Sequence, residues 1–197
     1  MKNVMSSRDV LLLGLDSGES YIREVLADVS GEEYEWEPIL LSERAADMLL
    51  PPERKKVWRV YRREGKWKYD YVPDVLDPPP FTTVAWLMNH VAQTADMYLY
   101  CIKSGKPEGR DRSWEDLSVP PEQGAMRDYI YQMLADVRAY PVSIPAGRVN
   151  CEMNRLGPAP WGKMRPAYMN IWGGVVEHAL HHAAQLAARK DRIRYGY

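Results

Sequence analysis

Apolar residues recur at spacings of three and four along four long stretches of the chain, a pattern that predicts amphipathic helices. The first helix is predicted to begin near Ser6, whose hydroxyl can cap it together with Asp9, and to end at Gly31. A shorter helix over residues 42–50 follows, and the proline pair at 51–52 stops it because proline cannot continue a helix.

The second and third long helices have their own start and stop signals. The second is predicted to be capped by Thr82 or Thr83 and to end before Gly105. The third is predicted to start at residues 120–122, where proline is tolerated in the first turn, and to stop at Pro141.

The fourth long helix is predicted to open near Pro166 and to reach about Arg192. Between the first and second helices, residues 57–72 change to an alternating pattern, with Glu64 and Gly65 at the centre. Alternation around a glycine-containing pair is typical of a β-hairpin. We expect this hairpin to lie against the helices.

The remaining segments are predicted loops: a polar one over residues 105–120 that holds Trp114, and a second one that includes residues 157–161. Four long helices with little sheet predict an all-α four-helix bundle, with a short extended or hairpin insertion between helices one and two. At 197 residues, the chain is predicted to form a single domain over residues 1–197.

Composition narrows the function classes. The formal net charge is −1 at pH 7, so no overall field favours nucleic acid or an anionic membrane. No apolar run approaches the roughly 18 residues that span a bilayer, and acidic residues interrupt residues 1–30, which therefore do not resemble a signal peptide. The two cysteines, Cys101 and Cys151, are too few for a disulfide framework and fit a reducing compartment. We expect a cytoplasmic protein.

Three of the four histidines lie within five residues, at His178, His181 and His182. On a helical wheel with His178 at zero, the apolar stripe is centred at about 90°, His182 falls at about 40° and His181 at about −60°. His178 and His182 therefore face inward, one turn apart, and His181 faces outward. Histidine is the commonest side-chain metal ligand, so the inward pair is a candidate site.

The remaining histidine, His90, also faces inward on the wheel of residues 81–104, whereas Asn89, Asp96 and Lys103 are predicted on the far side. Facing helices that carry inward histidines are how bundle proteins build metal sites. The alternative for each histidine is a core residue whose ring nitrogens bond a carbonyl or hydroxyl. Three inward histidines on two stripes favour metal.

Several neighbouring residues are predicted to support the histidines. Gln93 and Gln185, each one turn past a histidine, are candidates to bond the free ring nitrogens, and ordinary polar rim residues are the alternative. Four further side chains are predicted to line a pocket, although aromatic residues at helical spacing are more often core: Trp86, Met97, Tyr98 and Trp172. Cys101 shares the face of His90 and could supply a thiolate, but a buried free cysteine is the favoured interpretation.

Residues 54–68 combine basic and aromatic side chains, which together can bind phosphate and stack bases. The alternative is a hairpin whose aromatic face packs on the helices while its basic face meets water. The second interpretation is favoured because acidic residues balance the charge elsewhere and no nucleic-acid-binding motif is present.

The segments Pro78-Pro-Pro-Phe-Thr-Thr-Val-Ala-Trp-Leu-Met-Asn-His90 and Val176-Glu-His-Ala-Leu-His-His-Ala-Ala-Gln-Leu186 together resemble the DinB-like (YfiT-like) superfamily of metal-dependent enzymes. Trp36, Pro38 and residues 156–161 add to a resemblance that spans nearly the whole chain. It implies an up-down-down-up four-helix bundle, often dimeric.

The resemblance also implies a divalent metal, zinc or nickel most often, on His90, His178 and His182, the trio that the wheels select. Members with known activity are thiol S-transferases that use bacillithiol, mycothiol or glutathione, and a mycothiol-dependent isomerase. Glu177 precedes the first histidine and does not follow it, so the protease motif H-E-x-x-H is absent.

Three neutral imidazoles leave positions open on a metal, as in catalytic sites. Together with the resemblance, this favours a metal-dependent thiol S-transferase or hydrolase that acts on a small molecule. The resemblance implies a low-molecular-weight thiol as cosubstrate and a homodimer as the assembly, and the sequence identifies no general base. Two alternatives stay open: a stress-associated protein that holds metal without turnover, and, less favoured, a nucleic-acid-associated module that acts through residues 54–68. No membrane partner is expected.

Overall fold

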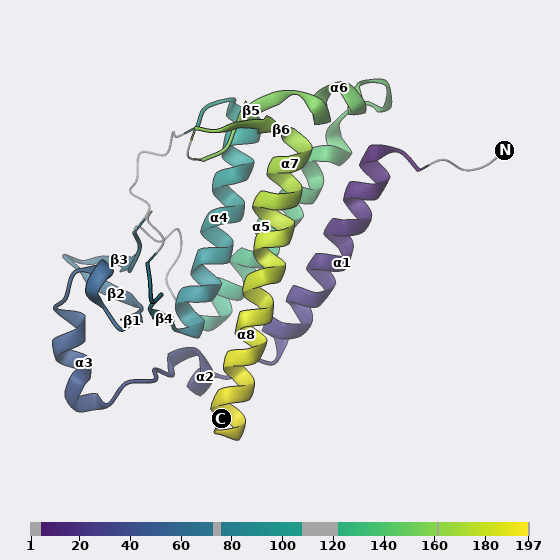
Figure 1. Cartoon of the computed structure of the whole chain (residues 1–197). Coiled ribbons are helices and arrows are strands. Elements are labelled where there is room, and N and C mark those ends of the chain that lie inside the picture. The colour runs from purple at the N-terminus through teal and green to yellow at the C-terminus, as the bar shows by residue number, and fades with distance from the viewer. Residues whose placement is uncertain (1–4, 73–75, 108–121, 161, 197) are drawn as a thin grey trace.

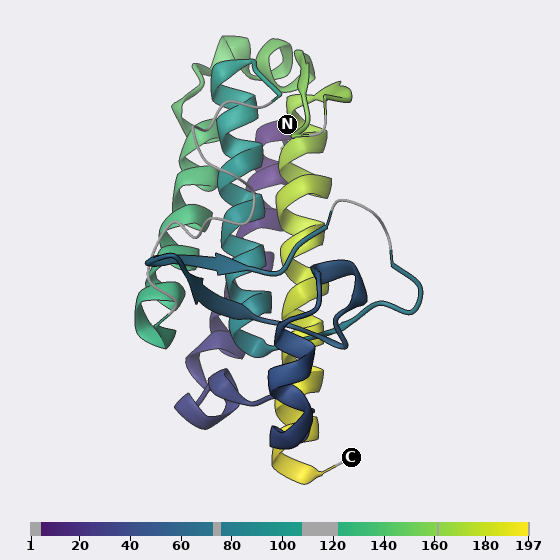
Figure 2. The same ribbon diagram turned by 90° about the vertical axis from the view of Figure 1, so that its left-hand side faces the viewer.

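The computed structural model describes residues 5–72, 76–107, 122–160 and 162–196. The fold is mostly helical, with a few short strands, as predicted. Its long elements are α1 (Ser7–Ala27), α4 (Val84–Ser104), α5 (Gln123–Ser143) and a C-terminal run of α7 (Ala167–Ile171), η3 (Trp172–Glu177) and α8 (His178–Tyr195). These elements lie side by side in Figures 1 and 2, with α1 and α4 each contacting both α5 and α8.

The helix starts follow the predicted capping chemistry. At the start of α1, the backbone N–H of Asp9 donates to Oγ of Ser6 at 3.2 Å, and the backbone N–H of Ser6 donates to the Asp9 carboxylate at 3.0 Å. At the start of α4, the backbone N–H of Trp86 donates to Oγ1 of Thr83 at 3.2 Å, so Thr83 is the cap. Gly105 ends α4 with a positive φ of 70°.

Three predicted helix ends are wrong. Helix α1 ends at Ala27, and Gly31 instead begins the short helix α2 (Gly31–Glu35), because Ser30 caps that helix. Helix α5 continues to Ser143, since Pro141 stands so near its end that the missing N–H affects only the last turn. Helix α8 continues beyond Arg192 and reaches Tyr195.

The insertion between α1 and α4 contains the predicted hairpin. Strands β2 (Val60–Arg63) and β3 (Lys66–Tyr69) pair antiparallel across Glu64 and Gly65, whose φ angles are 53° and 78°. Positive φ at both central residues gives the turn the twist that hairpin strands need. The insertion also holds α3 (Leu41–Met48), close to the helix predicted over 42–50, and η1 (Pro52–Arg54).

Two further strand pairs were not predicted. Strand β1 (Val57–Trp58) pairs in parallel with β4 (Phe81–Thr82), which ties the insertion to the start of α4. The segment between α5 and α7, predicted as a loop, contains η2 (Ala146–Arg148), α6 (Val149–Asn154) and a hairpin of β5 (Leu156–Pro158) with β6 (Met164–Pro166). Strands of two or three residues are too short for a periodic signal. Most of the predicted loop 105–120, with Trp114, lies outside the described residues.

Helix α4 is buried on more sides than its wheel predicts. Asn89 is fully buried, although the wheel places it on the far side of the helix with Asp96 and Lys103. The reason is that α5 covers this side, where the hydroxyl of Tyr129 donates to the Asp96 carboxylate at 2.9 Å. Helix α4 therefore lies between α5 and α8, which positions His90 toward α8. None of the helices described here is long and apolar enough to cross a membrane.

Candidate metal centre

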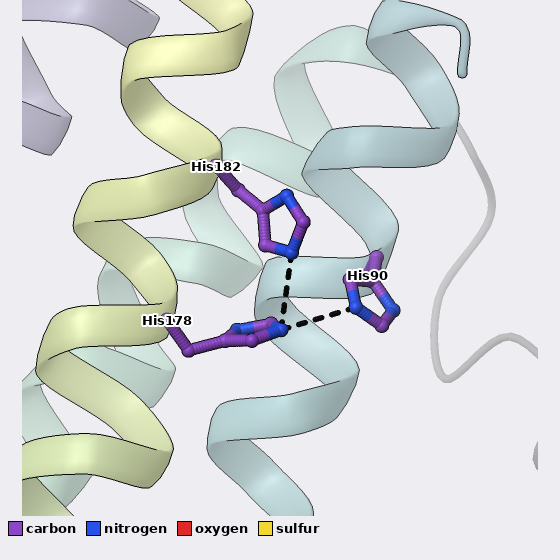
Figure 3. A group of neighbouring side chains, drawn as sticks. All are labelled: His90, His178 and His182. Atoms are coloured by element: carbon purple, nitrogen blue, oxygen red, sulfur yellow. Dashed lines mark hydrogen bonds between the residues drawn. The ribbon is translucent and has the colours of Figure 1, made fainter. Parts of the chain in front are cut away.

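His90, His178 and His182 converge at the contact between α4 and α8, as Figure 3 shows. Nε2 of His178 lies 3.1 Å from Nε2 of His90 and 3.1 Å from Nε2 of His182. One nitrogen from each ring can be chosen so that all three lie within 4.8 Å of one another. No other group of His, Cys, Asp or Glu among the described residues meets these criteria for holding a metal ion.

The π-helical segment η3 immediately before His178 helps to set this geometry. Gly174 in η3 packs on the ring of Tyr98 in α4, and a Cβ added at Gly174 would lie 2.3 Å from that ring. Only glycine therefore allows this approach of the two backbones. Single π-helical turns inside α-helices occur frequently at functional sites, and this one directly precedes the first histidine of the pair.

The three imidazoles are neutral near pH 7. Burial lowers the pKa of His178 to about 3, and the neighbouring rings of His182 and His181 add to this effect. Burial, with the two other rings, also holds the pKa of His90 well below its usual value. The pKa of His182 is lowered by burial as well, although its bond with Gln185 acts in the opposite direction. Neutral imidazole is the form that binds a metal ion.

Hydrogen bonds between the three rings cannot satisfy all of their Nε2 atoms. Nε2 of His178 faces two other ring nitrogens, but a neutral imidazole nitrogen carries either one N–H or one lone pair. It can therefore make a good hydrogen bond with only one of them, and the other contact leaves a buried nitrogen poorly paired. A cation that accepts a lone pair from each ring removes this conflict. The donor set of three nitrogen atoms fits zinc or nickel.

The profile of the DinB superfamily matches residues 15–186, which is most of the chain. The chain belongs to the DinB superfamily. Searches among curated proteins and among solved structures found no significant match. His90, His178 and His182 all lie within the matched range, so the family resemblance that their spacing indicates is confirmed.

In this DinB-superfamily chain, Gln185 is the polar residue best placed to orient a histidine. Its Oε1 lies 2.8 Å from Nδ1 of His182, and its Nε2 lies 3.1 Å from Nε2 of the exposed His181. Nδ1 of His90 has no hydrogen-bond partner among the described residues, so the predicted bond from Gln93 to this nitrogen is not formed. Three residues further along α4, its side chain points about 60° away from that of His90.

Trp86 packs face to face on His90, with ring centroids 4.6 Å apart at an angle of 20°. Its indole N–H donates to the carbonyl of Asp70 at 2.6 Å, and the buried Asp70 carboxylate pairs with Nζ of Lys55 at 2.6 Å. Tyr71 lies 6.4 Å from His90, ring to ring. The end of the hairpin thus forms one wall of the site. The sequence gives no signal for this, because consecutive buried residues at 69 and 70 break the alternation of the strand.

The other predicted pocket residues lie in different surroundings. Trp172 is 40% exposed, and not buried on the stripe as its wheel predicts, because a π-helical turn rotates each residue by less than 100°. It lines a groove of about 530 Å³ with Leu11, Met153 and Tyr168, away from the three histidines. Met97 is half-buried two turns beyond His90, so its pocket role stays a prediction.

Cys101 takes no part in the histidine cluster. It is buried, and its thiol donates to the carbonyl of Pro107 at 3.3 Å. The favoured interpretation, a buried free cysteine, is therefore confirmed for this residue, and the alternative of a thiolate ligand is wrong. Cys151 is exposed and free.

The basic segment 54–68 is paired in part within the fold, whereas Arg62, Arg63 and Lys66 are exposed. Arg59 is 3% exposed and bonds the carboxylates of Glu37 and Asp47 at 2.7 and 2.6 Å. The ring of Trp58 is buried against Trp86, at 5.3 Å between centroids. These contacts favour the hairpin packed on the helices over a nucleic-acid interface, because buried and paired cations cannot contact phosphate.

Proposed function

We propose that this protein is a metal-dependent enzyme that holds a divalent metal, zinc or nickel, on Nε2 of His90, His178 and His182. The observation that carries the proposal is the convergence of three neutral imidazoles from two facing helices, with His178 within 3.1 Å of both others. A proton-bonded cluster cannot satisfy this arrangement, and three nitrogen ligands leave positions open for a substrate.

The reaction that this centre supports best is thiol S-transfer or hydrolysis on a small molecule. A metal with three histidine ligands lowers the pKa of a bound water or thiol and thereby supplies a nucleophile at neutral pH. Neighbouring side chains orient the histidine ligands. Gln185 fixes the ring of His182, and Trp86 fixes the plane of the His90 ring and excludes water from one face of it. A low-molecular-weight thiol is the proposed cosubstrate.

We further propose the bundle arrangement, assembly and location of the family. In Figure 1, α4 and α5 run in the same direction, and α1 and α8 run in the opposite one, which supports an up-down-down-up bundle. A homodimer in the cytoplasm is the proposed form. Light scattering of the purified protein tests the dimer, since a mass corresponding to one chain would exclude it.

The metal proposal is tested by elemental analysis after exposure to zinc or nickel. The native chain is expected to retain about one metal ion per chain, and the variants His178→Ala and His182→Ala are expected to lose it. The matched control is His181→Ala, on the same helical turn but exposed, which should retain the metal. A native chain without metal, or equal loss in all three variants, would contradict the proposal.

A second candidate is a protein that holds the metal without turnover. The burial of His90 under Trp86 favours it, because a covered ligand holds a metal tightly but leaves less room for substrate. Thiol-consumption assays with bacillithiol, mycothiol and glutathione against a model electrophile separate the two. Metal-dependent consumption supports the enzyme, and its absence with all three thiols in the metal-loaded protein supports the binding protein.

A further inference from the structure

The metal-facing side of α8 continues past the histidines to an arginine. His178, His182, Gln185 and Arg189 are spaced by four, three and four residues, which places them within about 60° of one face of the helix. The guanidinium carbon of Arg189 lies 3.6 Å from the centre of the Phe81 ring, just before the start of α4. Arg189 therefore lies on the same face of α8 as His178 and His182, beside the segment that leads into α4.

Arg189 is a half-buried cation that the described residues leave without a carboxylate. Within that part of the chain, its only recorded partner is the face of Phe81, and its Nε is buried with no hydrogen-bond partner. Burial, with the charge of Arg192, lowers its pKa from the usual value. A buried guanidinium N–H without a hydrogen-bond partner is unfavourable, so an acceptor supplied by a ligand would stabilise Arg189 in this position.

The two cations that are fully buried among the described residues, Arg59 and Lys190, are paired. Arg59 bonds Glu37 and Asp47, and both carboxylates raise its pKa although burial lowers it. Lys190, the residue next to Arg189, is buried and reaches the carbonyl of Val25 at 2.9 Å. The fold thus supplies a partner to each of these two cations. Arg189 differs from these two cations because no carboxylate or carbonyl of the described residues bonds its guanidinium.

We propose that Arg189 recognises the carboxylate of the small molecule that reacts at the histidine centre, and so determines its specificity. This inference rests on the proposed function for the reacting end of the ligand. The planar fork of arginine matches a carboxylate through two parallel hydrogen bonds, and the Phe81 face holds the fork in place. The acidic end is the part of the ligand that Arg189 binds.

The spacing on α8 limits the length of the ligand. Seven residues separate His182 from Arg189, which corresponds to about 10 Å along the helix axis. Helical side chains lean toward the N-terminus of their helix, so the guanidinium lies closer to the histidines than its backbone does. A short organic acid with its reactive group at the far end from the carboxylate spans this distance.

The test compares two probes of equal length on the zinc-loaded full chain: mercaptohexanoate and mercaptohexanol. Both present a thiol to the histidine centre, but only the first presents a carboxylate to Arg189. Calorimetry is expected to show mercaptohexanoate binding about tenfold more tightly, the size of a charge-assisted hydrogen-bonded contact. Arg189→Gln should reduce the preference to less than about twofold, and Arg189→Lys should retain part of it.

Arg192→Gln is the matched control, because it removes an equal charge from an exposed position one turn further along α8. It should leave the preference intact. Equal binding of the two probes to the native chain, or equal loss in the Arg189 and Arg192 variants, would overturn the inference. The native comparison needs no variant, so it decides even if Arg189→Gln does not fold.

Failure of the proposed function gives a different result, since the chain would then take up no zinc and neither thiol would bind through its sulfur. In that case hexanoate against hexanol, followed by the NMR signal of the Arg189 Nε–H group, tests the carboxylate site alone. A shift of this signal that hexanoate causes and hexanol does not supports the carboxylate site. No shift with either probe overturns it.

Discussion

The substitution Gly174→Ala should damage both the stability of the fold and the geometry of the metal centre. The added Cβ would lie 2.3 Å from the ring of Tyr98, well inside van der Waals contact. Tyr98 is 3% exposed, so its ring has little room to move away. Relief has to come from a shift of η3 against α4; η3 leads directly into His178 of α8, and α4 carries His90.

The size of the effect follows from two opposing contributions. Overpacking by one methyl group in a tight interior costs about 1–3 kcal/mol. Alanine recovers about 0.5–1 kcal/mol over glycine in a helix, because glycine loses more backbone freedom on folding. The net free energy of unfolding should therefore fall by about 1 kcal/mol, within limits of about 0 and 2.5 kcal/mol. For a chain of this size that corresponds to a fall in Tm of several degrees, roughly 2–4 °C per kcal/mol.

Gly173→Ala is the matched control for this substitution. A Cβ at Gly173 meets only the carboxylate end of the exposed Glu177, at 3.4 Å, so it requires no shift of the backbone. Denaturant unfolding of metal-free protein and competition titrations with zinc measure the two variants. We expect Gly174→Ala to lose stability and zinc affinity while Gly173→Ala loses neither. Equal stability and zinc affinity in both variants would refute the role of the Gly174–Tyr98 contact.

Three further predictions concern other contacts of the fold. Metal-free protein should lose stability as the pH falls from about 6.5 toward 4, because the unfolded chain takes up protons that the buried His178, with a folded pKa of about 3, does not. The loss is on the order of 3 kcal/mol, and a slope of unfolding free energy against pH that is no smaller in His178→Ala would contradict it. Asp70→Ala should lower the free energy of unfolding by about 3–5 kcal/mol, because Lys55 is left buried without its partner. Denaturant unfolding measures this loss, with Asp128→Ala at an exposed position as the control. Ser6→Ala should lower the free energy of unfolding by about 1 kcal/mol through loss of the α1 cap, and an unchanged value would refute that role.

The site could be predicted from the sequence where helical geometry is regular. His178 and His182 stand one turn apart in α8, and His90 lies inside the uninterrupted α4, so a constant 100° per residue placed all three correctly. The caps at Ser6 and Thr83 followed from local chemistry in the same way. Such features depend on residues within one or two turns of each other.

Features that depend on distant residues could not be predicted. The exposure of Trp172 follows from a π-helical turn, which the hydrophobic periodicity of the sequence does not predict. The burial of Asn89 follows from α5, whose packing position the sequence of α4 does not contain. The contact of Trp86 with Asp70 joins α4 to the end of a hairpin across 16 positions of the chain. Tertiary packing decides each of these cases.

X-ray absorption at the metal edge of the zinc-loaded chain tests the central claim most directly. Zinc held by His90, His178 and His182 should show a shell of imidazole nitrogens at about 2.0–2.1 Å, and the shell should lose one nitrogen in His90→Ala. Sulfur scattering near about 2.3 Å, or an unchanged nitrogen shell in His90→Ala, would contradict a centre made of these three histidines.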